Sequence, residues 1–299
     1  MQARSMKHKK TIKTLLKIII SGFALYYVFS HINLHNIARE LRSAHSPWLL
    51  AALLCYALSQ VAAAFRLKVL FQRIPIGINH LENIRLYWLG LFYNLFLPGG
   101  VGGDGFKVYL LGRHLKSDLR KTLGAILSDR ISGLTVIVVF LLVLLPFLDF
   151  PLPLKEWAWT GIPLVVAAFW LFLRLFNASL LPAWAPTFGW ALLAQLLQMT
   201  AALFLLKSLP TSAGEPYNAY LFLFFLSAIA GSVPITLGGI GARELVFLWG
   251  AQYLGINEDT AVALSLLFYV ASAVTALPGL VFTFQPGKIL RRHTPKQQA

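Results

Sequence analysis

Residues 97–107, LPGGVGGDGFK, decide the fold that this sequence predicts. They follow the apolar segment 84–97 and bring a proline, glycines and two charges to the place where a helix would otherwise continue. Proline lacks the N–H that a helix interior needs, and repeated glycine is too permissive to hold a helix. A second apolar segment, residues 220–233, runs in the same way into PITLGGIGARE at residues 234–244. The sequence therefore predicts two broken helices.

The rest of the chain is too apolar for a water-soluble fold. Of its 299 residues 58% are hydrophobic and 12% are charged, and the mean hydropathy is +0.69. Soluble domains are about 45–50% apolar and about 25% charged, so a lipid bilayer is the natural solvent here. We expect an all-α integral membrane protein with about six full transmembrane helices, over residues 13–30, 48–70, 122–148, 158–176, 187–207 and 260–284.

The charge of the chain is strongly basic. Lys and Arg number 26 and Asp and Glu 11, so the formal net charge is +15. Such a balance in a soluble protein would suggest nucleic acid, but basic residues also flank membrane spans on the cytoplasmic side. We expect no nucleic-acid partner and contact with anionic lipid head groups instead. Cys55 is the only cysteine, which excludes an intrachain disulfide and a cysteine metal site.

The basic clusters also orient the chain. The N-terminal residues 1–12, the segment 113–121 and the tail 286–299 are the most basic, and all three should be cytoplasmic. Following the spans from there leaves both termini cytoplasmic and makes the two broken hairpins enter from opposite faces. Non-helical backbone at membrane depth survives where protein buries it or where it lines a wet cavity, so we interpret both as re-entrant hairpins. Two ordinary surface loops are the alternative. The first span could also be a signal peptide, but no Ala-x-Ala-like site follows it.

The two broken segments resemble each other. GGVG at residues 99–102 recurs as GGIG at residues 238–241, an offset of 139 residues (238 − 99). Paired interrupted segments in two halves indicate an inverted repeat with a central binding site. We therefore expect a single transmembrane domain over residues 1–299.

Charged residues at these breaks are the candidate site. Ends of broken helices expose N–H groups that favour anions, and Lys107 and Arg243 would add positive charge for a phosphodiester. Asp104 and Glu244 could pair with these cations, recognise an amine or carry a proton; salt bridges that only let the hairpins fold are the alternative. Arg130 either snorkels to the interface or faces the bundle. The substrate-binding candidates are Arg66, Gly99, Gly100, Gly102, Gly103, Asp104, Lys107, Asp129, Arg130, Gly238, Gly239, Gly241, Arg243 and Glu244.

The sequence has no motif that supports catalysis or cofactor binding. Residues 100–105 match G-x-G-x-x-G, but that motif needs a preceding strand in a soluble βαβ unit. No Walker A sequence, H-E-x-x-H or G-x-S-x-G occurs, and the seven histidines are scattered. We expect no catalytic residue, no metal and no cofactor.

Three ordered regions resemble the lysylphosphatidylglycerol synthase transmembrane-region family, also called flippase-like domain proteins: Pro98–Asp104 with Lys107, Asp129–Leu134, and Pro234 with Gly238–Gly241 and Glu244. In the bifunctional members of that family, a separate soluble domain makes aminoacylated phosphatidylglycerol. The transmembrane domain, which this chain resembles, moves that lipid between leaflets. The resemblance implies a stand-alone member without the synthase domain, in the bacterial inner membrane, that is a flippase or transporter for a phosphate-bearing or glycolipid. From the paired breaks we expect the head group to bind between the two glycine-rich turns. A membrane transferase using a lipid-linked substrate and a non-transporting assembly partner in envelope lipid synthesis are the alternatives. A homo-oligomer or an envelope-biosynthesis partner also fits the sequence.

Overall fold

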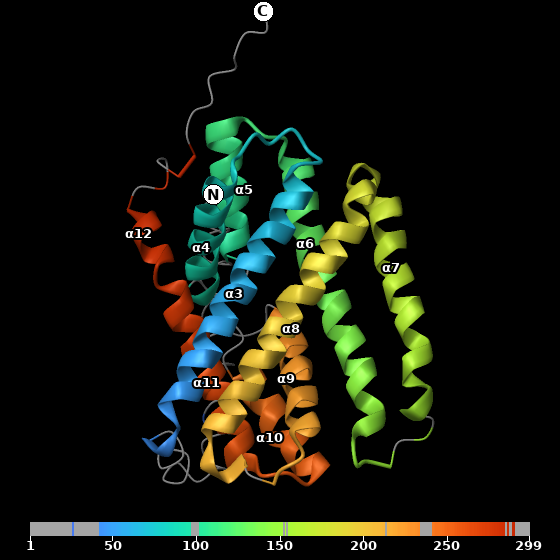
Figure 1. Cartoon of the computed structure of the whole chain (residues 1–299). Helices are drawn as coiled ribbons and strands as arrows, with labels where there is room; N and C mark the ends of the chain where they lie inside the picture. The colour runs from blue at the N-terminus through green and yellow to red at the C-terminus, as the bar shows by residue number, and fades with distance from the viewer. Residues whose placement is uncertain are drawn as a thin grey trace, which may run out of the picture.

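The computed structural model describes residues 26, 42–96, 102–151, 153, 155–212, 214–233, 241–284, 286, 289 and 290. Across these residues the regular structure is helical and contains no β-strand (Figure 1). The α-helices are α3 (Ser46–Phe71), α4 (His80–Phe96), α5 (Gly102–Leu115), α6 (Leu119–Leu144), α7 (Gly161–Phe176), α8 (Trp184–Ser208), α9 (Tyr217–Ser232), α10 (Ala242–Leu254), α11 (Glu258–Ala276) and α12 (Gly279–Thr283). Four 3-10 turns are η1 (Leu145–Phe147), η2 (Lys155–Thr160), η3 (Ala178–Ala183) and η4 (Pro210–Ser212).

Among the described residues, five helical segments are long and apolar enough to cross a membrane. They are Ser46–Phe71, Leu119–Phe147, Lys155–Phe176, Ala178–Ser208 and Glu258–Ala276. They overlap five of the six predicted spans, and the predicted span 13–30 lies outside the described residues except for residue 26. The protein is thus an all-α integral membrane protein.

The prediction of one continuous span over 260–284 is wrong. Helix α11 ends at Ala276, and α12 begins only at Gly279. Pro278 lies between them, and its missing backbone N–H interrupts the helical hydrogen bonds there, although Leu277 keeps helical dihedral angles.

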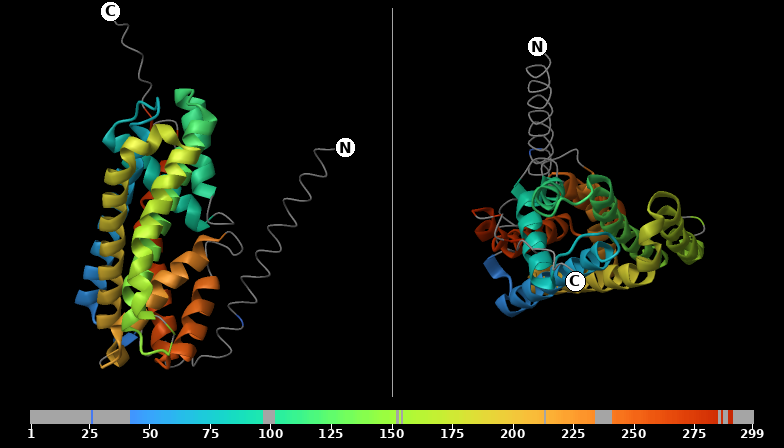
Figure 2. Two further views of the ribbon diagram at one scale, coloured as in Figure 1. Left: turned by 90° about the vertical axis from the view of Figure 1, so that its right-hand side faces the viewer. Right: turned by 90° about the horizontal axis from the view of Figure 1, so that it is seen from above.

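Two hairpins of short helices occupy opposite halves of the molecule. Helices α4 and α5 pack together in one half, and α9 and α10 pack together in the other (Figures 1 and 2). This arrangement agrees with the two broken hairpins expected from the sequence. The second arm of the first hairpin, α5, begins at Gly102, inside the glycine-rich segment 97–107 that was predicted to break the helix. Gly102, Gly103 and Gly105 are therefore helical and not part of a turn.

The two halves form an inverted repeat. Helices α3 and α8 run side by side in opposite directions at the centre, and the helices of the second half begin 137–140 residues after their counterparts (184 − 46, 217 − 80, 242 − 102 and 258 − 119). The contacts correspond as well: α6 packs on α9 as α11 packs on α4. Even the helix caps match, because Asp118 caps α6 and Asn257, 139 residues later (257 − 118), caps α11.

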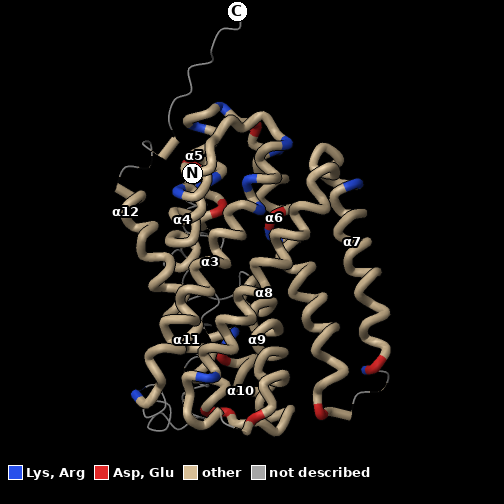
Figure 3. The backbone as a smooth tube through the Cα atoms, viewed as in Figure 1, with Lys and Arg blue, Asp and Glu red and all other residues tan. Residues whose placement is uncertain are grey.

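Charge is distributed unevenly along the long axis. The end that carries the α5–α6 connection is rich in Lys and Arg, whereas acidic residues gather at the opposite end, near α10 (Figure 3). The residues that lie between these two ends are largely apolar, and two large clusters of buried apolar side chains pack inside the two halves of the molecule. Helices α3, α5 and α6 nevertheless carry buried charged side chains between these ends, and these mark the site described next.

Candidate functional site

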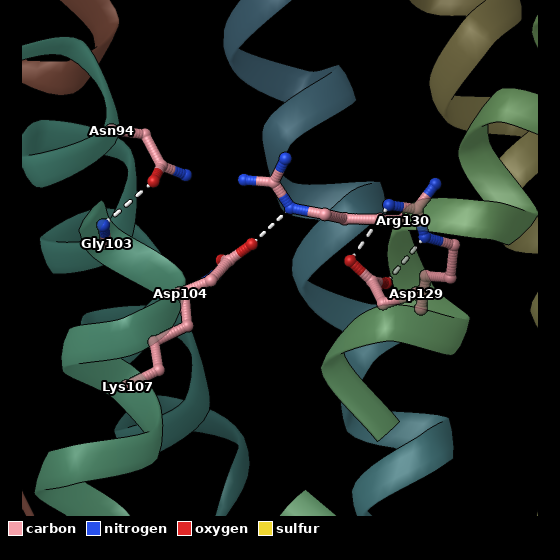
Figure 4. Close-up of polar contacts among 7 residues, drawn as sticks. Asn94, Gly103, Asp104, Lys107, Asp129 and Arg130 are labelled. Atoms are coloured by element: carbon pink, nitrogen blue, oxygen red, sulfur yellow. Dashed lines mark hydrogen bonds and ion pairs between the residues drawn. The ribbon is translucent and has the colours of Figure 1, made fainter. Parts of the chain in front are cut away.

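An ion-pair network joins α3, α5 and α6. Arg66 of α3 donates to both carboxylate oxygens of Asp129 in α6, at 2.7 Å from Nε and 3.1 Å from Nη2. Asp104, near the start of α5, accepts from Lys107 Nζ at 3.0 Å and from Arg130 Nε (Figure 4). The sequence predicted all five of these residues as candidates, and the structure places them together.

The network tests one of the alternatives left open by the sequence. Arg130 turns toward Asp104 and does not snorkel to the interface. Lys68, which also lies on α3, is buried as well, and its side chain donates to the Ile78 carbonyl. Each cation has a protein acceptor in the bundle, which removes the need to reach the interface.

Small residues that the sequence analysis did not connect to this site make room for the cations. A Cβ at Gly133 would lie 3.0 Å from Arg66 Nη1, and a Cβ at Gly90 would overlap the Lys107 side chain. Lys107 Nζ also lies 4.6 Å from the ring centroid of Tyr87, within cation–π range. Glycine inside a membrane helix is a weak signal for such a role, because glycine is common there for packing reasons as well.

Helix α5 begins against the backbone of α4. The Gly103 N–H donates to Asn94 Oδ1 at 2.8 Å, which satisfies one of the free N–H groups at the helix start (Figure 4). A Cβ at Gly103 would overlap the carbonyl group of Gly90. The glycine therefore permits this close approach, and the approach fixes the position of Asp104 one residue later.

A cavity of about 290 Å³ lies beside this network, among α3, α4, α6, α8 and α9. We call it the arginine cavity, because Arg66 and Arg130 both line it. Gln195 and Gln198 of α8 line it too, and Gln195 is 6% exposed. The Gln195 side-chain oxygen has no hydrogen-bond partner among the described residues. A buried acceptor oxygen without a hydrogen-bond donor is a place where a donor group of a ligand would bind.

The charge around the arginine cavity favours an anion. Three cations, Arg66, Lys107 and Arg130, face two carboxylates, Asp104 and Asp129, so the cluster is formally +1 (3 − 2). The two glutamines were not among the predicted residues. The sequence signal that could have identified them is a pair of amide side chains within an otherwise apolar span. This signal is weak, because polar side chains in spans also form interhelical contacts.

Helix α10 carries a second polar cluster. Gly241 has a φ of 85°, which a side chain rarely adopts, and its N–H donates to Glu244 Oε2 at 2.7 Å. Ser265 Oγ of α11 donates to the other oxygen of this buried carboxylate at 3.0 Å. The Arg243 guanidinium lies 5.1 Å from the Phe268 ring centroid, and its Nε has no hydrogen-bond partner in the described part of the chain.

The two clusters remain distinct in the structure. Within the described ranges, no ion pair joins Arg243 to Glu244, and none joins this cluster to the network of α3, α5 and α6. The candidates Gly99, Gly100, Gly238 and Gly239 lie outside the described residues. Among the described residues, no group of three His, Cys, Asp or Glu side chains is placed to hold a metal ion.

Comparison with known proteins gives the relatives of this chain. A sequence model of the family "Lysylphosphatidylglycerol synthase TM region" matches residues 14–183. The phosphatidylglycerol lysyltransferase of Staphylococcus haemolyticus is 22% identical over 314 residues, covering 95% of this chain and 36% of that protein. The phosphatidylglycerol lysyltransferase of Bacillus subtilis is 24% identical over 302 residues, covering 92% and 34%. The chain thus spans about a third of the length of these relatives. The match confirms the resemblance drawn from the glycine breaks and the Asp129-Arg130 region: the chain belongs to the family of the lysylphosphatidylglycerol synthase transmembrane region.

Proposed function

We propose that the protein is a lipid flippase that moves a phospholipid between leaflets, with the head group entering the arginine cavity. The observation that carries this proposal is a cavity inside a membrane bundle lined by two guanidinium groups and an unpartnered glutamine oxygen. Charged side chains at membrane depth are costly and usually mark a substrate pathway. An anionic head group is the substrate that this lining suits.

The cavity fits a head group and not a whole lipid. Its volume of about 290 Å³ lies at the lower limit of small-molecule pockets, which run from about 300 to 1,000 Å³. The phosphate would pair with Arg130, whose side chain is 30% exposed and therefore more accessible than Arg66. A head-group hydroxyl would donate to Gln195. The acyl chains would stay in the bilayer.

The relatives support a phospholipid as the cargo. They are named for lysyl transfer to phosphatidylglycerol, and this chain matches about a third of their length. The resemblance implies translocation for this part. The excess of Lys and Arg at one end favours the cytoplasmic side of the cell membrane for that end. From the basic segments 1–12 and 286–299 of the sequence we expect both termini on the same side. Anionic lipid would then enter from the cytoplasmic leaflet.

Leaflet exchange in reconstituted vesicles tests this function. Phosphatidylcholine vesicles that contain the protein and fluorescent phosphatidylglycerol would be quenched from outside with dithionite. The wild type should make the inner-leaflet probe accessible, and Arg130→Gln should slow exchange at least about tenfold, the effect of losing about 1.4 kcal/mol of interaction.

A matched charge change gives the control. Arg113→Gln removes one arginine from an exposed position of α5 outside the cavity and should exchange lipid within twofold of the wild type. A wild type that exchanges neither phosphatidylglycerol nor another anionic phospholipid would exclude the flippase function. Equal exchange by the Arg130 variant and the wild type would exclude the arginine cavity as its site.

A further inference from the structure

A cavity of about 340 Å³ lies at the acidic end of the molecule, between the end of α6 and the hairpin of α9 and α10 (Figures 1 and 3). The chain just after α6 lines it with Leu145, Leu148 and Phe150. The hairpin lines it with residues 222–226 of α9 and with residues 246–254 of α10. All lining side chains are apolar or aromatic, so we call it the apolar cavity. It shares no lining residue with the arginine cavity.

Local backbone geometry shapes the walls of the apolar cavity. After η1 the chain becomes extended at Leu148, with a ψ of 136°, and the Leu148 side chain is buried. The Phe150 ring then lies 5.8 Å from the Tyr253 ring of α10, centroid to centroid. A Cβ at Gly250 would overlap the Leu223 side chain, so this glycine allows α9 and α10 to approach closely. The cavity is thus bounded by specific turns and contacts.

The open side of the apolar cavity faces lipid. Leu226, Trp249 and Tyr253 line it and are exposed on the surface. The spans Leu119–Phe147 and Lys155–Phe176 are connected at this end, which places the rim near the boundary between hydrocarbon and head groups, where Trp and Tyr gather. Water does not fill a cavity that offers it no hydrogen-bond partners. An acyl chain from the surrounding bilayer is the occupant that this lining suits.

Charged residues at the rim favour one class of head group. Lys155 Nζ donates at 2.5 Å to the carbonyl of Leu148, a lining residue, and can bind a phosphate with its other donors. Asp149 lies between the lining residues Leu148 and Phe150, and Glu156 follows Lys155; both carboxylates are exposed. Their formal sum with Lys155 is −1 (1 − 2), which disfavours an anionic head group. A phosphate that carries a primary amine complements these charges.

We propose that the apolar cavity holds one acyl chain of a resident phosphatidylethanolamine-type lipid, with its phosphate beside Lys155 and its amine beside Asp149 and Glu156. This inference does not depend on lipid translocation, because the resident lipid stays bound in the leaflet at the acidic end. An apolar cavity destabilises a protein in proportion to the volume left unfilled. The acyl chain fills this volume and packs the end of α6 against the α9–α10 hairpin.

A photoreactive lipid tests the site. Phosphatidylethanolamine with a diazirine near the end of one acyl chain would be mixed into vesicles of phosphatidylethanolamine, phosphatidylglycerol and phosphatidylcholine that contain the full chain. After illumination, peptide mass spectrometry should place the attached lipid on residues 222–226 and 246–254. Val246→Phe fills the cavity from inside and Leu226→Trp from its exposed rim. Each should lower this labelling at least about tenfold, because the displaced chain loses apolar contact area.

Two controls separate the chain and the head group. Val270→Phe makes the same change as Val246→Phe on an exposed position of α11 outside the cavity, and its labelling should equal that of the wild type. Within the described residues no ion pair joins Lys155 to Asp149 or Glu156. Asp149→Asn combined with Glu156→Gln should therefore remove the preference for the phosphatidylethanolamine probe over a phosphatidylcholine probe, while the labelled residues stay the same.

Three results would overturn the inference. Undiminished labelling in both filled variants would exclude the apolar cavity as the acyl-chain site. Equal labelling of the wild type by a phosphatidylglycerol probe would exclude the assigned head group. A dimer that the wild type forms in native mass spectra and both filled variants lose would identify a second copy of the chain as the occupant. Labelling requires no lipid exchange, so its outcome is separate from that of the flippase test.

Discussion

Removing the negative charge of Asp129 should destabilise the protein strongly. The carboxylate accepts two hydrogen bonds from Arg66, and the two side chains are 9% and 8% exposed. Removing one partner from a buried pair leaves an uncompensated charge and costs about 3–5 kcal/mol. Arg66 is also electrostatically coupled to Asp104, so part of its charge stays compensated. We therefore expect Asp129→Asn to cost about 3 kcal/mol, the lower end of that range.

A double-mutant cycle measures this energy. Unfolding by SDS in mixed micelles would give the free energy of unfolding for the wild type, Asp129→Leu, Arg66→Met and the Arg66→Met/Asp129→Leu protein, with Asp129→Asn measured beside the cycle. Apolar side chains of similar size often replace a buried pair without loss of stability. The apolar double variant should therefore lie within about 1 kcal/mol of the wild type. It should nevertheless exchange lipid slowly, because the arginine cavity has lost one of its guanidinium groups.

Two results would contradict this reasoning. A cost below about 1 kcal/mol for Asp129→Asn would mean that the pair behaves as a solvated surface pair. Recovery of both stability and exchange in the apolar double variant would show that Arg66 serves folding only. The cycle thus distinguishes the structural and the functional role of the same ion pair, which the sequence left open.

Five further substitutions test the close contacts, a strained glycine and a buried hydrogen bond. Gly103→Ala should cost about 1–3 kcal/mol because its Cβ would overlap the α4 backbone, whereas Gly105→Ala on the same helix, with nothing within 4 Å, should gain about 0.5–1 kcal/mol; SDS unfolding measures both. Gly241→Ala should cost about 1–3 kcal/mol in the same assay, since its φ of 85° is strained for alanine. Ser265→Ala removes a hydrogen bond to a buried carboxylate and should cost about 1.5–3 kcal/mol; Ser265→Thr, which keeps the hydroxyl, should recover most of this loss.

Much of the fold follows from hydropathy and helix breakers. Five spans and both broken hairpins were predictable because a membrane span needs a long apolar segment and because proline and glycine interrupt it. The start of α5 was not, since Gly103 is helical only in the context of α4, which accepts its backbone at close range. A break in the sequence pattern marks where a helix is weak, but a tertiary contact decides at which residue the next helix begins.

The partners in the site were harder to predict than its members. Charges at membrane depth identified Arg66, Asp104, Asp129 and Arg130 as candidates, because each is costly to bury alone. Nothing in the sequence pairs Arg66 with a carboxylate 63 residues away, because the pairing depends on how α3 crosses α6. Pairing with a cation was one alternative for Glu244, but the structure shows hydrogen bonds from neutral groups, which satisfy a buried carboxylate as well.

The mixed charge around the arginine cavity constrains how a flippase of this design could work. A head group held by arginines in this cavity must leave it again to complete translocation. Each tenfold gain in affinity at this site adds about 1.4 kcal/mol to that step. Asp104 and Asp129 reduce the net charge of the cluster to +1, which weakens anion binding and keeps the step small. On this argument the carboxylates serve exchange as much as folding, because a site with three uncompensated cations would hold an anionic lipid without releasing it.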